Sequence, residues 1–505
     1  MLDELDYYRD ERVIRRMLEY CGVPPALTQH FSLGHDYHRY DKGSLLNDRS
    51  DLSTLTDAMS TEYLVGWGRY LVENRNYGFE SVKNFSMGWL LDKGLDIFRS
   101  IWDRENTIGI IDVEYFSRKY PGLAYADPES TYAKLEPFHR CLMHTLFHFG
   151  FNPLVLATGQ GYHYVFRIHN ASPLAERLVQ IGHVEASTKD KYLQRGGRRD
   201  RIVTLEEGKR FDAIGKLIEF LVHLTIHQRD HFGTWLPVTI GDIAVGNEAQ
   251  EAINVDLSCY ANPLFMRDIR LPFSTHQKHK LQARKVGQWV SSNIPIQIAI
   301  PRYTPCNGNE LSLFELLHNR RHFLNSANYA GAITTEIPEC SHGLWNLLQA
   351  YYASPLHQFH IHYDWAQQEN PFYWPYTYDR FDLRMVPPCV AHILAHPNPA
   401  LLQPTQIQTV VRTLCSKEWW HPKHVAGLIR SKYERNFGWE IDWTKYDANM
   451  WALGWTRFYA GMLADGTDHK EDFNCLSHQQ KGIAWADRPF CVQPFCGYSL
   501  SAYSQ

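Results

Sequence analysis

The sequence predicts an α+β protein, because strand-like segments lie among longer segments with helical periodicity. A run of β-branched residues at 108–114 predicts a buried strand. Two further apolar runs, at 154–157 and 162–168, flank a turn that contains two glycines, and this pattern predicts a hairpin. A further short strand is expected at 253–257.

Helices are expected where apolar residues recur every three or four positions, at 11–21, 138–149 and 211–231. Most of the first 100 residues are expected to be helical as well. Beyond residue 385, apolar stripes at 407–414 and 425–429 predict a mostly helical C-terminal part. The segment between these parts is rich in Pro, His, Trp and Tyr and shows little periodicity. The expected division is therefore a mixed unit at 1–300 with a helical part at 1–100, a connecting region at 301–385 and a helical unit at 386–505.

Length and composition are those of a globular protein with more than one core. The chain has 505 residues, of which 44% are hydrophobic and 21% charged. A net charge of −4 argues against binding nucleic acid by bulk charge, although a local basic channel is compatible with it. The chain has no apolar run of membrane-spanning length and no signal-peptide pattern, so an intracellular protein without a membrane partner is expected. Its ten cysteines then favour metal binding over disulfides.

Two carboxylates mark the end of the strand at 108–114. Asp112 and Glu114 are one residue apart, and alternate side chains of a strand face the same side. Because like charges on one face repel, the pattern favours a divalent cation between them, most simply Mg²⁺ or Mn²⁺. The alternative is a strand that ends in solvated acids.

Two further segments extend this chemistry. His163 follows the glycine turn, and a third acid, Asp256, precedes a segment with Arg270, Ser274, His276 and Lys278. A polyphosphate bound through metals needs carboxylates for the cations, and amides, imidazole and cationic groups for the phosphate oxygens. The alternatives are a core histidine at 163 and surface charges at 270 and 278.

These segments resemble the three motifs of the archaeo-eukaryotic primase superfamily, which contains the primase small subunit and the primase-polymerases. The first motif resembles Asp112 and Glu114, the second Thr158, Gly159, Gly161 and His163, and the third Asp256 with Arg270, Ser274, His276 and Lys278. The similarity covers about 100–285. It implies a primase-type catalytic core of mixed sheets flanked by helices, one half of it like an RNA-recognition motif. The zinc knuckle of many relatives is missing, since no cysteine lies between Cys141 and Cys259.

The resemblance implies a primase or primase-polymerase that joins nucleoside triphosphates on a single-stranded DNA template. Asp112, Glu114 and Asp256 would bind two Mg²⁺ or Mn²⁺ ions, and the residues of the second motif and the basic segment would bind the triphosphate. A gap-filling or lesion-bypass polymerase and a non-catalytic nucleic-acid-binding factor are the alternatives. A replicative helicase or other replication proteins are further candidate partners, in the nucleoid of the cytoplasm.

Four cysteines near the C-terminus have the sparse spacing of a metal site. Cys389 follows two prolines at a helix start, Cys475 lies 86 residues later, and Cys491 and Cys496 follow it. This part is similar to the iron–sulfur domain of the primase large subunit, which implies a [4Fe–4S] cluster, with zinc as the alternative.

A row of histidines recurs every four residues on the helix expected at 211–231. His223, His227 and His231 are interpreted as a polar helix face, with a zinc site as the alternative.

Overall fold

The computed structural model describes most of the chain. The described residues are 4–22, 64–69, 79–83, 96–101, 105–117, 120–192, 203–241, 251–261, 268–281, 287–306, 308–395, 404–416, 420–435, 447–470, 472–475 and 477–478. Side chains of 64–69 and 79–83 are not described further. The fold is α+β, as the sequence predicts.

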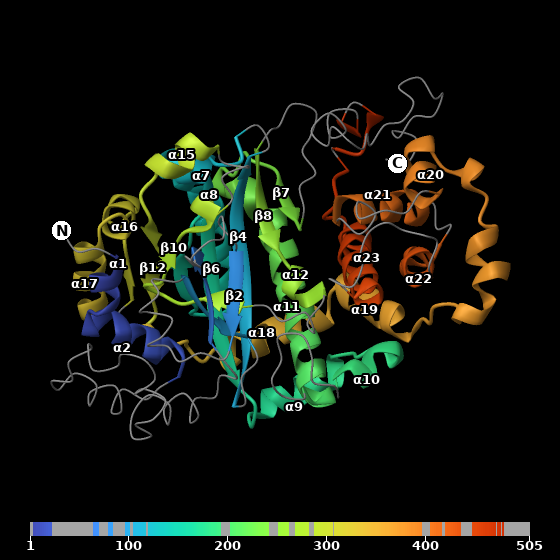
Figure 1. Cartoon of the computed structure of the whole chain (residues 1–505). Helices are drawn as coiled ribbons and strands as arrows, with labels where there is room; N and C mark the ends of the chain where they lie inside the picture. Colours follow the sequence, from blue (N-terminus) through green and yellow to red (C-terminus); the bar gives the residue numbers. More distant parts are fainter. Residues whose placement is uncertain are drawn as a thin grey trace.

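A seven-stranded mixed sheet forms the centre of the protein (Figure 1). Neighbouring strands are antiparallel except for the parallel pair of β7 and β8 at one edge. In spatial order the strands are β13 (Asn309–Glu310), β12 (Ile300–Thr304), β5 (Leu154–Ala157), β6 (Gly161–His169), β4 (Asn106–Ser117), β8 (Glu251–Asp256) and β7 (Val238–Ile240). The strands expected at 108–114, 154–157, 162–168 and 253–257 are thus confirmed as β4, β5, β6 and β8.

Strand β4 has two different faces at its C-terminal end. Val113 and Tyr115 are buried, whereas Asp112, Glu114 and Phe116, which alternate with them along the strand, are only partly buried. The buried face packs against the long helix α11 (Leu205–Gln228), which also contacts α8 (Pro128–Phe149). The other face is open enough to carry polar side chains.

A second sheet of four strands lies in the order β2 (Phe79–Lys83), β1 (Leu64–Arg69), β3 (Asp96–Ser100) and β9 (Asp268–Arg270). Three of these strands lie in the first 100 residues, where the sequence predicts mainly helix. Strand β1 pairs with β2 and β3, and β3 pairs with β9 about 170 residues later. Such long-range pairing leaves no helical or strand periodicity in the local sequence, so the structure differs from the prediction here.

The N-terminal helices hold the segment that follows β9. Helix α2 (Glu11–Tyr20) confirms the helix expected at 11–21, and α1 (Glu4–Tyr8) precedes it. Tyr7 Oη donates to Phe273 O at 2.9 Å, and Tyr8 Oη lies 2.8 Å from Thr275 Oγ1. Phe273 has a positive φ of 63°. These contacts therefore fix a strained turn just before β10 (Thr275–His276), which pairs with β11 (Gln297–Ile298).

The segment 301–385, expected to be a connecting region, contains regular structure. Strand β12 extends the central sheet, and four helices follow: α16 (Leu313–Arg320), α17 (Phe323–Ala332), α18 (Ser341–Tyr352) and α19 (Pro355–Trp365). Helix α17 packs against α1 and α2, and α18 packs against α8 and α11. Much of this segment is therefore part of the core.

The C-terminal part is helical, with α20 (Pro388–Ala395), α21 (Pro404–Cys415), α22 (Pro422–Tyr433) and α23 (Ala448–Ala464). Helix α23 packs against α21, α22, α19 and the short helix α12 (Ser258–Ala261) (Figure 1). Among the helices of the described residues, none is long and apolar enough to cross a membrane.

Candidate active site

The register of the central sheet brings the three predicted acids together. Asp112 on β4 lies directly opposite Asp256 on β8, and Glu114 follows two residues later on the same face. Directly opposite residues of antiparallel strands have Cα atoms about 4.5–5.5 Å apart. Asp256 also accepts a hydrogen bond from Ser258 N at 2.8 Å, which fixes its side chain at the start of α12.

His163 lies on β6, the strand that flanks β4 on the side opposite β8. His163 and Asp112 are paired between β6 and β4, and His163 Nε2 is 3.4 Å from Asp112 Oδ1. Burial, with a smaller contribution from the charges of Arg270 and Lys278, lowers the pKa of His163 to about 3. His163 is therefore an uncharged imidazole at neutral pH and does not offset the charge of the acids.

The turn between β5 and β6 is held from inside. Thr158 N donates to Gly161 O at 2.8 Å, and the Thr158 hydroxyl donates to the same oxygen at 3.2 Å. Tyr132 Oη donates to Thr158 O at 2.5 Å and receives a hydrogen bond from Arg320 Nη1 at 2.6 Å. The Thr158 side chain thus shapes the turn. Gly161 lies opposite Glu114, and a Cβ atom there would lie 1.8 Å from Val113 O.

Arg270 is brought to the site by the second sheet. Its Nη1 lies 3.0 Å from Asp96 Oδ2 on β3 and also donates to Thr275 O, and its guanidinium lies over the Phe98 ring. Asp96 is only 2% exposed and receives two more hydrogen bonds, from Thr275 Oγ1 and Gln277 N. Arg270 is consequently a rigidly positioned cation.

Ser274, predicted to bind the nucleotide, makes two hydrogen bonds within the protein. Its side chain is fully buried, and its Oγ accepts a hydrogen bond from Ile97 N at 2.7 Å. The hydroxyl also donates to Thr275 O at 3.2 Å. In this structure Ser274 therefore ties the segment after β9 to β3.

His276 and Lys278 meet the glycine turn. The His276 ring lies against Gly159 so closely that a Cβ atom on that residue would be 2.1 Å from His276 Cε1. Lys278 Nζ lies 3.5 Å from Gln160 Oε1. Burial lowers the pKa of His276, and Arg270 and Lys278 lower it further. Residues of the second and third predicted motifs therefore lie side by side. Gly159, Gln160, His276 and Lys278 form one wall of the candidate site.

Sequence reasoning missed three residues of this region. Asn254 lies opposite Glu114 on β8, and its Oδ1 is buried without a hydrogen-bond partner among the described residues. Asn254 lies two residues before Asp256, so the alternation of side chains along a strand predicts that both face the same side. Asp96, which pairs with Arg270, and Tyr125, whose ring lies 5.7 Å from the His276 ring, had no such signal, because the residues that they contact come from distant segments.

The acids form no metal cluster as they stand. Within the described ranges, no three His, Cys, Asp or Glu side chains are grouped closely enough to share one ion. The donors nevertheless suit Mg²⁺ or Mn²⁺, because Asp112, Glu114, Asp256 and Asn254 offer oxygen atoms on one face of the sheet.

The C-terminal cysteines lie partly outside the described residues. Cys389 on α20 and Cys475, about 85 residues later, both pack against the buried Phe473 ring. Two of the four predicted ligands are therefore close in space. Cys491 and Cys496 are not among the described residues.

The histidine row on α11 contacts the C-terminal part. His223 Nδ1 lies 2.5 Å from Asp465 Oδ2, and His227 Nε2 lies 3.1 Å from Thr467 Oγ1. His231 is exposed in the 3₁₀ turn that follows the helix. The row is thus a polar face that packs against the loop after α23.

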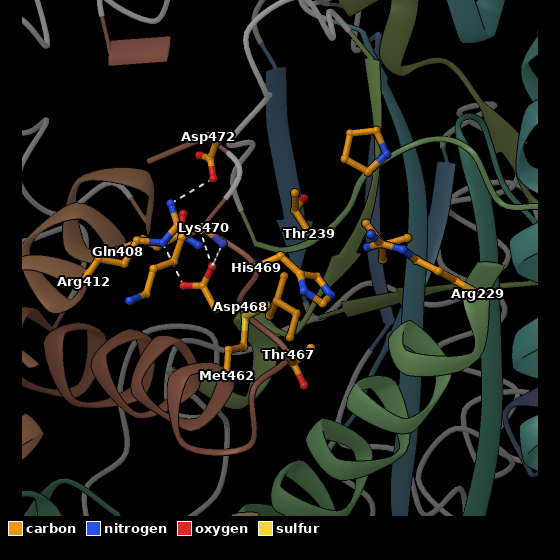
Figure 2. Close-up of a pocket in the computed structure, with 13 residues that line it drawn as sticks. Arg229, Thr239, Gln408, Arg412, Met462, Thr467, Asp468, His469, Lys470 and Asp472 are labelled. Carbon is orange, nitrogen blue, oxygen red and sulfur yellow. Dashed lines mark hydrogen bonds and ion pairs between the residues drawn. The ribbon is translucent and has the colours of Figure 1, made fainter. Parts of the chain in front are cut away.

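A pocket of about 490 Å³, open to solvent, lies between the edge strand β7 and that loop (Figure 2). Arg412 is held there by Asp468 at 2.6 Å and Asp472 at 2.9 Å. The side chains of His469 and Arg229, which extend toward each other in Figure 2, both line the pocket. None of the predicted active-site residues lines this pocket.

Searches against family models, curated proteins and solved structures found no match to this chain.

Proposed function

We propose that this protein is a DNA primase or primase-polymerase that joins nucleoside triphosphates on single-stranded DNA. The observation that supports this proposal best is the register that sets Asp112 directly opposite Asp256, with Glu114 on the same face. Like charges at directly opposite positions destabilise an antiparallel pair. A divalent cation bound between the carboxylates would offset this repulsion.

Asp112, Glu114 and Asp256 would hold the Mg²⁺ or Mn²⁺ ions, with Asn254 beside them. When bound, such ions lower the pKa of a coordinated hydroxyl and offset the charge of the leaving group. The reaction forms a bond between the 3′ oxygen of one nucleotide and the α-phosphorus of the next. The bond to pyrophosphate breaks.

The glycine turn and the segment from Arg270 to Lys278 would supply positive charge for the phosphates. Arg270 is fixed by Asp96, and Lys278 and His276 lie against the glycine turn. His163 and His276 both have a lowered pKa, partly because Arg270 and Lys278 act on them. Burial is the larger cause of both shifts, and the two cations, Arg270 and Lys278, are the groups of this region that suit a triphosphate.

The test is nucleotide incorporation by Asp112→Ala. With Mg²⁺ or Mn²⁺, labelled triphosphates and unprimed single-stranded DNA, the unmodified protein should make dinucleotides and longer products. Asp112→Ala should make none but still bind DNA, as measured by fluorescence anisotropy. Asp230→Ala is the matched control, because the Asp230 side chain is 83% exposed and lies away from the sheet face.

The same assay separates the alternatives. Extension of a primer without formation of a dinucleotide would assign the site to gap filling or lesion bypass. DNA binding without incorporation under either metal would leave a non-catalytic binding factor. Synthesis by Asp112→Ala at the unmodified rate would refute the assignment of the acids.

For the C-terminal part we propose a [4Fe–4S] cluster or zinc held by Cys389, Cys475, Cys491 and Cys496. Support comes from the packing of Cys389 and Cys475 against one ring. Anaerobically purified protein should contain iron and absorb broadly near ~400 nm, and Cys389→Ser should reduce both. Zinc without iron in such a sample would favour the other metal.

A further inference from the structure

Tyr125 carries a buried hydroxyl that the protein itself does not satisfy. The residue lies on the short helix α7 (Leu123–Ala126) and is 4% exposed. Its Oη has no hydrogen-bond partner among the described residues. A buried hydroxyl without a partner costs free energy, and such groups are uncommon in folded proteins. The hydroxyl is therefore available to a partner that arrives from solution.

The surroundings of Tyr125 identify where that partner would lie. Helix α7 contacts β4, the strand of the acids. The Tyr125 ring lies 5.7 Å from the His276 ring and 5.1 Å from the His279 ring, centroid to centroid. Since His276 also covers Gly159, Tyr125 belongs to the same wall as the glycine turn.

Two opposite charges act on this hydroxyl. Burial raises the pKa of Tyr125 strongly, the Glu114 carboxylate raises it further, and Arg270 lowers it. The phenol therefore stays protonated and can donate a hydrogen bond. The contact of α7 with β4 and of the Tyr125 ring with His276 sets this hydroxyl beside the proposed nucleotide site.

We propose that the Tyr125 hydroxyl donates a hydrogen bond to a phosphate oxygen of the bound nucleoside triphosphate. This inference rests on the proposed function, since it assigns a further residue to the same site. An anionic oxygen is the favoured acceptor, because hydrogen bonds to charged groups are the stronger ones.

Tyr125→Phe tests the proposal without changing the packing of the ring. The thermal midpoint of the free protein should stay the same or rise, because the substitution removes an unsatisfied polar atom. Affinity for a non-hydrolysable nucleoside triphosphate with Mg²⁺, measured by calorimetry, should fall by about tenfold. Affinity for the same nucleoside without phosphates should not change.

Tyr132→Phe is the matched control. Its hydroxyl is also buried, but it donates to Thr158 O and Gly161 O and accepts from Arg320. Removal of that hydroxyl should lower the midpoint.

Three results would overturn the inference on Tyr125. These are equal triphosphate affinity in Tyr125→Phe and the unmodified protein, a fall in midpoint together with affinity, or an equal loss for the nucleoside. An unmodified protein that binds no triphosphate would instead refute the proposed function as a whole.

Discussion

Gly159→Ala should disrupt the wall between the glycine turn and the basic segment. The added Cβ atom would lie 2.1 Å from His276 Cε1 and 2.3 Å from Nε2. An ordinary carbon–carbon contact is about 3.5 Å, so the ring would have to move by roughly 1.4 Å. His276 is 5% exposed and its ring also packs near Tyr125. Because the ring has little free space, we expect a loss of about 1–3 kcal/mol in the free energy of unfolding.

Chemical denaturation measures this loss, and triphosphate binding by calorimetry measures the effect on the site. The double variant Gly159→Ala with His276→Ala should recover much of the stability, because the methyl group then enters the space of the ring, but it should not recover affinity. Gly331→Ala is the control: this glycine is exposed on α17, and the nearest atom to a Cβ there is Arg12 Cδ at 3.1 Å, on a flexible side chain. If Gly159→Ala were as stable as Gly331→Ala, the reasoning about the ring contact would be wrong.

Two further predictions concern buried charges. Arg457→Met should lower the free energy of unfolding by about 1.5–3 kcal/mol, because the buried Asp212 loses the guanidinium at 2.5 Å and keeps Lys216 at 2.9 Å. Arg384→Met, at an exposed pair, should leave the denaturation midpoint unchanged. His276 has a lowered pKa in the folded protein, so below about pH 6.5 the unfolded chain takes up a proton that the folded chain does not, and stability falls by up to about 1.4 kcal/mol per pH unit. His276→Gln should make this acid-side decline shallower by one proton, and an identical slope in both proteins would contradict the assignment.

The parts of the site that the sequence predicted are those set by local alternation. Asp112 and Glu114 share a face because they are two residues apart on a strand, and that strand could be recognised from its β-branched residues. The hairpin of β5 and β6 could be recognised from its glycines, and it places His163 beside Asp112. Neither inference needed any knowledge of distant segments.

The parts that were missed depend on pairing between distant segments. Arg270 is fixed by Asp96, which lies on a strand that the sequence did not predict. That strand is short and is stabilised by pairing with β1 and β9 rather than by its own composition. The sequence likewise did not reveal that the Ser274 hydroxyl accepts a hydrogen bond from Ile97 N. A sequence motif can thus predict which residues lie near a site. The tertiary contacts decide which of these side chains are available to a ligand.

Helix α11 shows why the C-terminal helices matter for the site. Polar residues recur along one face of this helix, and their partners come from α19, α23 and the loop after α23. The bonds are Asp212 with Arg457, Lys216 with Asp364 at 2.6 Å, Glu219 with His360 at 3.2 Å and His223 with Asp465.

Helix α11 also contacts β4, the strand that carries two of the acids. A buried charge that loses its partner is costly, so these pairs favour one arrangement of the helices over others. The C-terminal helices are therefore docked on the layer beneath the acids, and a loosely tethered C-terminal unit, as a connecting region would imply, is the less favourable arrangement. Arg457→Met should consequently weaken this docking as well as the fold, which faster proteolysis between α19 and α23 in that variant would reveal.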